Sequence, residues 1–275
     1  RIMLSAHMDE IGVIATYVDE KGFVRFTTIG GVRANTCIGG RVRFLNGTQG
    51  LIYMERSEDG GRLPGIENLY IDVGAGSRAD CPVKVGDLAA FERPFLDLGG
   101  RLISKAMDDR VSVAVLIEVL RQMVSSPHEL YFVFSTQEEV GLRGATTAAY
   151  GIDPDLGIAV DVTATGDTPK GLRMEVSLGK GPAIKVRDGG MLSDPRVVHW
   201  MVDTAEAAKI PYQLEVLEGG TTDARAIQLA RAGVLAGCIS IPTRYIHSPS
   251  EMVDYGDVQN SVKLLVALLS GPINL

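Results

Sequence analysis

The sequence predicts an α/β fold that carries a second, β-rich domain. After about residue 98, helix-like segments alternate with short apolar segments, which is typical of a sheet covered by helices on both faces. Between about residues 12 and 90 the chain is instead rich in glycine and β-forming residues. The opening segment RIMLSAH has the buried character of the later strands. We therefore expect it to belong to the α/β sheet, which the β-rich part interrupts.

Two hairpins are predicted in the β-rich part. The stretch IGVIATYVDEKGFVRFTTIGG turns at Glu20-Lys21-Gly22, and the stretch GGRVRFLNGTQGLIYM turns at Asn46-Gly47. The segments LYIDVGA and DLAAFE continue the pattern. We expect residues 13–89 to form a small β-barrel or sandwich, and residues 1–12 and 90–275 to form the α/β domain.

The elements of the α/β domain follow from hydrophobic periodicity and from short apolar runs. Helices are predicted over residues 109–124, 194–209, 223–233 and 256–269, and strands over residues 129–135, 156–162, 212–217 and 235–242. Strands separated in this way by helices are expected to run parallel.

Composition excludes several classes of protein. The 27 basic and 34 acidic residues give a net charge of −7 without a basic run, which disfavours a nucleic-acid surface. No apolar stretch reaches the roughly 18 residues of a membrane span. Cys37, Cys81 and Cys238 lie far apart without a CxxC motif, so a reducing, cytoplasmic setting is the simplest expectation. Because the chain opens inside a strand without an initiator Met, we expect that preceding residues are missing.

Acidic and imidazole side chains follow the apolar segments. Ligands of open α/β sheets bind outside the carboxyl ends of the strands, so residues at those ends are candidates for a site. The candidates are His7, Asp9, Asp108, Asp109, Glu138, Glu139, Asp161 and His247. Each alone has a structural explanation, such as a satisfied His-x-Asp pair, a helix N-cap or a solvated strand end. The other histidines, His128 and His199, are interpreted as structural.

Together, these residues indicate a metal site. Two histidines and several carboxylates at one edge fit the mixed nitrogen and oxygen ligands of a catalytic zinc-type ion. The excess of carboxylate indicates two metals that share a ligand, roughly 3.5–4 Å apart. Two dications would also explain why Glu138 and Glu139 are adjacent at a strand end, where repulsion and desolvation oppose two like charges.

Six motifs resemble those of a known family. They are SAHMDEIG, ISKAMDDRVSVAVL, FSTQEEVGLRGA, IAVDVTATGD, GGTTDA and RYIHSPSEMVD. In order and spacing they are similar to the glutamyl/leucyl aminopeptidases that include the tetrahedral (TET) peptidases and the endoglucanase-like FrvX proteins. The resemblance covers essentially the whole chain. It implies a zinc-peptidase α/β domain with an inserted β-barrel-like domain, which removes N-terminal residues from peptides with two divalent metals, usually zinc or cobalt.

The resemblance also implies the roles of individual residues. His7 and Asp161 are expected to bind one metal, Glu139 and His247 the other, and Asp108 both.

Three further acids take roles around these ligands. Glu138 matches the general base that accepts a proton from the metal-activated water. Asp9 matches the acid that holds the metal-bound imidazole and fixes its tautomer. Asp109 matches no ligand and is expected to support the turn.

Two further stretches have both a structural and a functional interpretation. Thr222 is expected to cap the following helix, whereas the resemblance favours Asp223 as a substrate-facing residue. Arg244, beside His247, could bind a substrate carboxylate or pair with a neighbouring acid.

Two other functions compete with the aminopeptidase. Adjacent acids invite a glycoside hydrolase, but such enzymes place their carboxyls on opposite sides of the sugar bond, about 5–9.5 Å apart. A non-catalytic relic is the second alternative, and the retained Glu138 disfavours it. The resemblance further implies peptide substrates and a large homo-oligomer, commonly a tetrahedral dodecamer built partly through the inserted domain. Acidic, aliphatic and basic side-chain preferences all occur on this scaffold, and no motif chooses among them.

Overall fold

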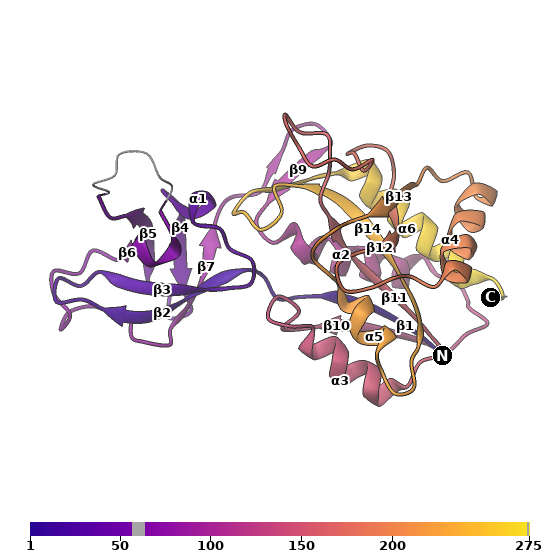
Figure 1. Ribbon diagram of the computed structural model, residues 1–275, viewed down its shortest axis with the longest axis horizontal. Helices are drawn as coiled ribbons and strands as arrows, with labels where there is room; N and C mark the ends of the chain where they lie inside the picture. Colours follow the sequence, from indigo (N-terminus) through magenta and orange to yellow (C-terminus); the bar gives the residue numbers. More distant parts are fainter. Residues whose placement is uncertain (57–63, 274) are drawn as a thin grey trace.

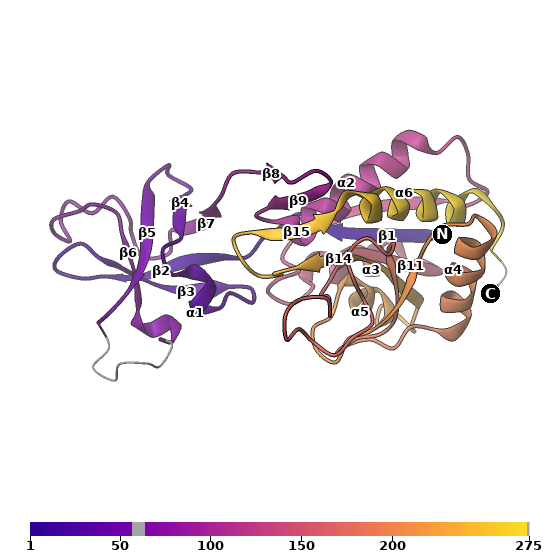
Figure 2. The same cartoon turned by 90° about the horizontal axis from the view of Figure 1, so that it is seen from above.

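The computed structural model describes residues 1–56, 64–273 and 275. A closed barrel forms one end of the molecule and an α/β domain forms the other (Figures 1 and 2). The predicted fold class is therefore confirmed. The β-rich part forms a barrel rather than a sandwich.

Among the described residues, the barrel consists of six antiparallel strands in the order β2-β3-β6-β5-β4-β7. Their bounds are β2 Gly12–Val18, β3 Val24–Ile29, β4 Arg41–Phe44, β5 Gln49–Met54, β6 Leu69–Asp72 and β7 Leu88–Glu92, with a short helix α1 at Ala34–Cys37 and a 3₁₀ helix η1 at Ile66–Asn68. Both predicted hairpins are present, and their turns use glycines with positive φ, Gly22 at 89° and Gly47 at 90°. Alternate residues such as Val42, Phe44 and Ile52 point inward and are almost fully buried.

The α/β domain is built on a nine-stranded sheet whose centre is parallel. The strands β10 (Leu130–Ser135), β1 (Ile2–His7), β11 (Leu156–Thr163) and β14 (Leu235–Arg244) lie side by side and run in the same direction. Strand β12 (Ala183–Arg187) pairs antiparallel with β14, and β13 (Gln213–Val216) pairs parallel with β12. The carboxyl ends of the four central strands therefore meet at one edge of the sheet, as the sequence predicts.

One predicted strand end differs from this scheme. The segment before Asp108 contains β9 (Arg101–Ser104), which pairs antiparallel with β15 (Glu251–Asp254) and with β8 (Leu96–Asp97). Asp108 therefore does not follow a parallel strand; it enters the site from the first turn of helix α2 (Met107–Gln122).

In the part of the chain that the structure describes, five helices cover the sheet. Helices α2, α4 (Pro195–Ala207) and α6 (Tyr255–Ser270) share one apolar core with the central strands, and α3 (Arg143–Ile152) and α5 (Asp223–Gln228) pack together on the other face (Figure 2). Helix α5 ends at Gln228, earlier than predicted, because its C-cap residue Leu229 leaves helical geometry (φ −91°, ψ 2°) and Arg231 beyond it has a positive φ of 52°. The predicted N-cap is confirmed, since the Thr222 side chain accepts a hydrogen bond from the Ala224 N–H.

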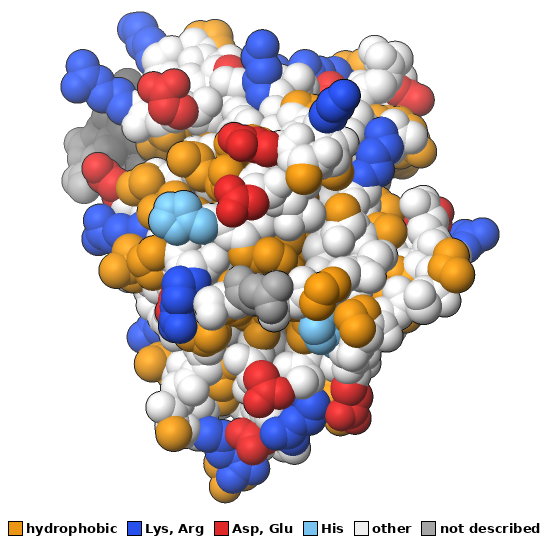
Figure 3. All heavy atoms as spheres, turned by 90° about the vertical axis from the view of Figure 1, so that its right-hand side faces the viewer, with side chains coloured by type: hydrophobic (Ala, Val, Ile, Leu, Met, Phe, Trp, Pro, Cys, Tyr) orange, Lys and Arg blue, Asp and Glu red, His pale blue; other side chains and the backbone are white. Residues whose placement is uncertain are grey.

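No helix in the described part of the chain is long and apolar enough to span a bilayer. On the face of the α/β domain that lies at the right-hand end of Figure 1, acidic and basic side chains are interspersed with apolar ones (Figure 3). This face therefore has mixed charge, unlike the basic field of a nucleic-acid surface.

Candidate active site

The candidate residues converge at the carboxyl ends of the central strands. His7 is the last residue of β1, Asp161 lies near the end of β11, and Glu138 and Glu139 follow β10. His247 lies in the loop after β14. The structure thus brings together side chains from segments that are far apart in the sequence.

Asp108 lies between the two histidines. Its Oδ1 is 3.0 Å from Nε2 of His7, and its Oδ2 is 3.3 Å from Nε2 of His247. The same Nε2 of His247 is 3.3 Å from Oε2 of Glu139, while Oε2 of Glu138 is 3.9 Å from Nε2 of His7. Each oxygen of one carboxylate therefore faces a different imidazole.

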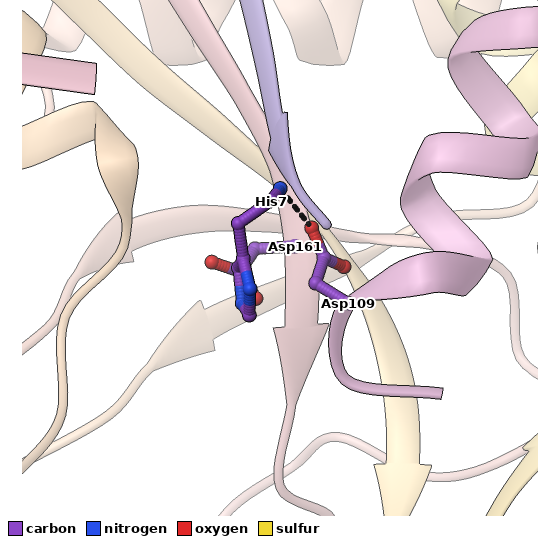
Figure 4. Close-up of side chains that lie close together, drawn as sticks. All are labelled: His7, Asp109 and Asp161. Atoms are coloured by element: carbon purple, nitrogen blue, oxygen red, sulfur yellow. Dashed lines mark hydrogen bonds between the residues drawn. The ribbon is translucent and has the colours of Figure 1, made fainter. Parts of the chain in front are cut away.

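Asp109 and Asp161 also lie close to His7 (Figure 4). One ligand atom from each of the three residues lies within 4.8 Å of the others. Oδ2 of Asp109 accepts a hydrogen bond of 3.2 Å from the His7 backbone N–H. Asp109 thus fixes the end of β1, and its carboxylate is also close enough to contribute to an ion site.

Asp9 orients two parts of the site. Its backbone carbonyl lies 3.1 Å from Nδ1 of His7, and since a carbonyl only accepts, Nδ1 carries the proton. Its carboxylate is 3.5 Å from that nitrogen and accepts the backbone N–H groups of Glu138 and Glu139 at 3.2 and 3.3 Å. The imidazole tautomer is therefore set mainly by the carbonyl of Asp9, whereas the carboxylate holds the loop that carries the two glutamates.

Sequence reasoning missed Glu251. This buried acid accepts the backbone N–H of Asp108 with Oε2 and that of His247 with Oε1, both at 2.9 Å. It therefore links the two segments that supply these candidate ligands. The signal was available, because Glu251 is the acid four residues after His247 in the motif RYIHSPSEMVD.

Two adjacent glycines, Gly30 and Gly31, were also missed. A Cβ at Gly30 would lie 2.6 Å from Oε2 of Glu139, and a Cβ at Gly31 would lie 2.2 Å from Nδ1 of His247. The loop after β3 of the barrel therefore passes directly over the site, at a distance that side chains would prevent.

The electrostatics of the site favour a bound cation. Burial and the charge of Asp161 raise the pKa of Glu138 to about 9, and burial also raises the pKa of Asp109 and Asp161 well above the ordinary range. Although burial alone lowers the pKa of His247, its hydrogen bonds to Asp108 and Glu139 raise it to about 10. The acids are thus crowded enough to hold protons unless positive charge is supplied.

The donor atoms fit a divalent metal. Oε1 of Glu139 and Oδ1 of Asp109 are buried without a hydrogen-bond partner among the described residues, so both have a free lone pair. His7 takes part in two groups that could hold an ion, one with Asp108 and Glu139 and one with Asp109 and Asp161. Imidazole nitrogen with carboxylate oxygen is a donor set that zinc and similar ions accept.

Two predicted substrate contacts lie elsewhere. Asp223 is buried beneath the site, where its Oδ2 accepts hydrogen bonds from Ser5 Oγ at 2.6 Å and Ser135 Oγ at 2.5 Å. It ties β1 to β10 and does not line the cavity at the site. Arg244 forms a bidentate ion pair with Asp167, with N–O distances of 3.0 and 2.8 Å, which agrees with the structural alternative for that residue.

The site opens into a large cavity of about 1460 Å³. Small-molecule sites usually have about 300–1,000 Å³, so this space can accept several peptide residues. Its apolar lining includes Leu142, Leu172, Met174, Val216 and Leu229. The acid cluster therefore lies in the wall of a large, partly apolar cavity.

Comparison with known proteins assigns the family. The sequence matches the M42 glutamyl aminopeptidase family over residues 1–264. A lysyl aminopeptidase of Pyrococcus furiosus is 36% identical over 285 residues, which cover 98% of this chain and 81% of that protein. The aminopeptidase APDkam598 from Desulfurococcus kamchatkensis has a TM-score of 0.94 at 44% identity, covering 98% of this chain and 79% of that one.

A third relative is the TET1 peptidase of Pyrococcus horikoshii, described as able to assemble into a tetrahedron or a large octahedral shell. It has a TM-score of 0.88 at 32% identity, with 98% of this chain and 83% of that chain covered. The resemblance seen in the six sequence motifs is confirmed by these matches, and this chain belongs to the M42 glutamyl aminopeptidase family of peptidases.

Proposed function

We propose that this protein is an aminopeptidase that uses two divalent ions, zinc or cobalt, to remove N-terminal residues from peptides. The observation that carries the proposal is the position of Asp108, whose two oxygens face His7 and His247 at 3.0 and 3.3 Å. A carboxylate between two imidazoles is suited to bridge a pair of ions.

We propose the remaining ligands from the family resemblance. His7 and Asp161 would hold one ion, and Glu139 and His247 the other. The Nδ1 proton of His7 is directed at Asp9, so its Nε2 offers a lone pair on the side of Asp108. The free oxygen of Glu139 supports its assignment as a ligand.

Glu138 is proposed as the general base. When bound, the ions would lower the pKa of water and polarise the scissile carbonyl. Glu138 lies at the edge of the cluster, where its backbone N–H is held by Asp9. Positive charge at the site would lower the pKa of Glu138 from about 9, so that its carboxylate could accept the proton of the attacking water and pass it to the leaving amine.

The test is removal and restoration of the metal. The protein is treated with EDTA, dialysed, and assayed on aminoacyl-anilides before and after addition of zinc or cobalt. Loss of activity with EDTA and recovery with either metal supports the proposal. Activity that survives complete removal of metal contradicts it, and metal-independent cleavage of a β-glucan would favour the glycoside hydrolase instead.

We also propose roles for the barrel and for the assembly. Residues 13–89 would act as an inserted lid and oligomerisation domain on a catalytic domain of residues 1–12 and 90–275. The close approach of Gly30 and Gly31 to Glu139 and His247 supports the role as a lid. The assembling TET1 relative supports a homo-oligomer, which could be a tetrahedral dodecamer. Light scattering that gives a monomer would contradict this part.

A cytoplasmic location is proposed from the cysteines. All three, Cys37, Cys81 and Cys238, are free. Free thiols are typical of a reducing compartment. Thiol titration of the protein purified under anaerobic conditions should find three reactive groups after denaturation.

A further inference from the structure

We propose that the cavity binds the free C-terminal carboxylate of short peptides through Arg33, Arg173 and Arg225. We call these three residues the arginine rim. The inference rests on the proposed aminopeptidase function and adds to it a class of substrate, namely short peptides with an unblocked C-terminus.

The arginine rim is assembled from three separate segments. Arg33 precedes α1 in the barrel, Arg173 lies in the loop between β11 and β12, and Arg225 lies in α5. All three line the cavity that contains the acid cluster. All three are also solvent-exposed, so they are accessible to a ligand in that cavity.

The three guanidinium groups are available for a ligand. Within residues 1–56, 64–273 and 275, no ion pair or side-chain hydrogen bond engages them. The two other cations of the cavity differ in this respect, because Lys185 is buried in an ion pair with Glu215 and Arg231 stacks on Tyr150. The arginine rim therefore supplies the free positive charge of the cavity wall in this part of the chain.

The cavity lining carries charge of both signs. The acids Asp108, Glu138, Glu139 and Asp161 gather where the proposed ions bind. Among the described residues, the lining contains one further acid, the exposed Glu218, and the three cations of the arginine rim. A ligand with separated positive and negative ends is therefore complementary to the cavity.

A short peptide has this charge distribution. Its N-terminal ammonium is attracted to the acid cluster, and its C-terminal carboxylate matches the planar donors of arginine. The cavity volume of about 1460 Å³ leaves room for a few residues between the two ends. In a long peptide the C-terminal carboxylate would lie beyond the arginine rim and lose this contact.

The position of Arg33 is set by the glycines over the site. Gly30 and Gly31 hold the barrel loop against Glu139 and His247. Arg33 follows two residues later and begins α1 as its N-cap residue. The position of Arg33 in the cavity wall therefore depends on the same loop that contacts Glu139 and His247.

The expected selectivity is moderate, since the arginines are exposed. Contacts between exposed charges are each worth up to roughly fivefold in binding. Three of them predict a preference of about tenfold in kcat/KM for a peptide acid over its amide, mainly through KM. The preference should shrink in 1 M NaCl, where the screening length is about 3 Å.

The experiment uses the metal-loaded full chain. The N-terminal residue X that is cleaved fastest as an anilide is placed in three peptides: X-Gly-Gly, X-Gly-Gly amide and X-Asp-Gly amide. Each is assayed with the wild type, with Arg33→Gln, Arg173→Gln, Arg225→Gln and their triple combination, and with the matched control Arg121→Gln. Arg121 is an exposed arginine of α2 outside the cavity.

We expect the wild type and Arg121→Gln to prefer the peptide acid about tenfold, and the triple variant to treat acid and amide alike. Equal cleavage of the two by the wild type, or a preference that survives in the triple variant, would overturn the proposal. Cleavage of X-Asp-Gly amide as fast as X-Gly-Gly would overturn the assignment to the C-terminus, because a side-chain carboxylate would then suffice.

A binding measurement separates this inference from the proposed function. Calorimetric titration of metal-loaded Glu138→Gln with Gly-Gly-Gly and its amide needs no turnover. Tighter binding of the acid, abolished in the same protein by the triple substitution, supports the arginine rim even if no peptide is cleaved. Equal binding of acid and amide contradicts it even if the enzyme is an active aminopeptidase.

Discussion

Gly31→Ala should inactivate the site without unfolding the protein. The added Cβ would lie 2.2 Å from Nδ1 and 2.6 Å from Cε1 of His247, whereas ordinary contact begins at 3.4 Å. The imidazole must therefore retreat by roughly 1 Å, and a misplacement of that size can cost about 10²-fold in rate. Gly31 does not have a positive φ, so the alanine itself brings no backbone strain.

The assay combines three measurements on the zinc-loaded protein. We expect kcat on the best anilide to fall about 100-fold and the metal content to drop toward one ion per chain, since His247 is a proposed ligand. The melting temperature should change little, because Gly31 is exposed.

The matched control is Gly151→Ala at the end of α3, where a Cβ would meet nothing within 4 Å. That variant should keep full activity and both metals. Wild-type activity and metal content in Gly31→Ala would refute the claim that the barrel loop and His247 are packed against each other.

Three further predictions test other contacts. Elemental analysis of Glu138→Gln should find both ions, whereas its kcat should fall by about 10²–10⁴-fold, because the amide cannot accept a proton. An unchanged kcat would remove Glu138 from the mechanism. Asp108→Ala should lose metal, and full occupancy of both sites in that variant would rule out bridging. Asp167→Asn should destabilise the protein by about 1–2 kcal/mol at pH 7, since the hydrogen bond from Arg244 lowers the pKa of Asp167 to about 2. Because folding lowers that pKa, the stabilisation is complete above the ordinary value of 3.8 and is lost as the pH falls toward 2. Urea unfolding should therefore show that the difference in free energy of unfolding between wild type and variant vanishes over this pH range. A difference that stays constant with pH would contradict the ion pair as its cause.

The sequence predicts the fold well where local chemistry decides it. Turn glycines such as Gly22 and Gly47 are required by their positive φ, so both hairpins could be predicted. Alternation of helices with apolar strands likewise predicts the sheet. The direction of β9 could not be predicted, because antiparallel pairing with β15 depends on a segment about 150 residues later. The end of α5 depends on the backbone conformation at Leu229 and Arg231, which composition does not reveal.

The candidate active site, like the fold, could be predicted from the sequence only in part. His7 and His247 could be identified without the structure, because imidazole side chains are rare after apolar strand segments. Glu251 acts through backbone N–H groups, so its role depends on which strand lies beside α2. Asp223 has the chemistry of a substrate contact, but its carboxylate is turned away from the cavity by two buried serines. Burial and direction of a side chain are tertiary properties, and sequence patterns indicate them only weakly.

The central claim is that one carboxylate, Asp108, joins two dications. The most direct measurement is an anomalous difference map from crystals of the zinc-loaded protein. We expect two peaks per chain, one near each oxygen of Asp108, with Nε2 of His7 at one and Nε2 of His247 at the other. A single peak, or two peaks that do not share Asp108, would contradict the account.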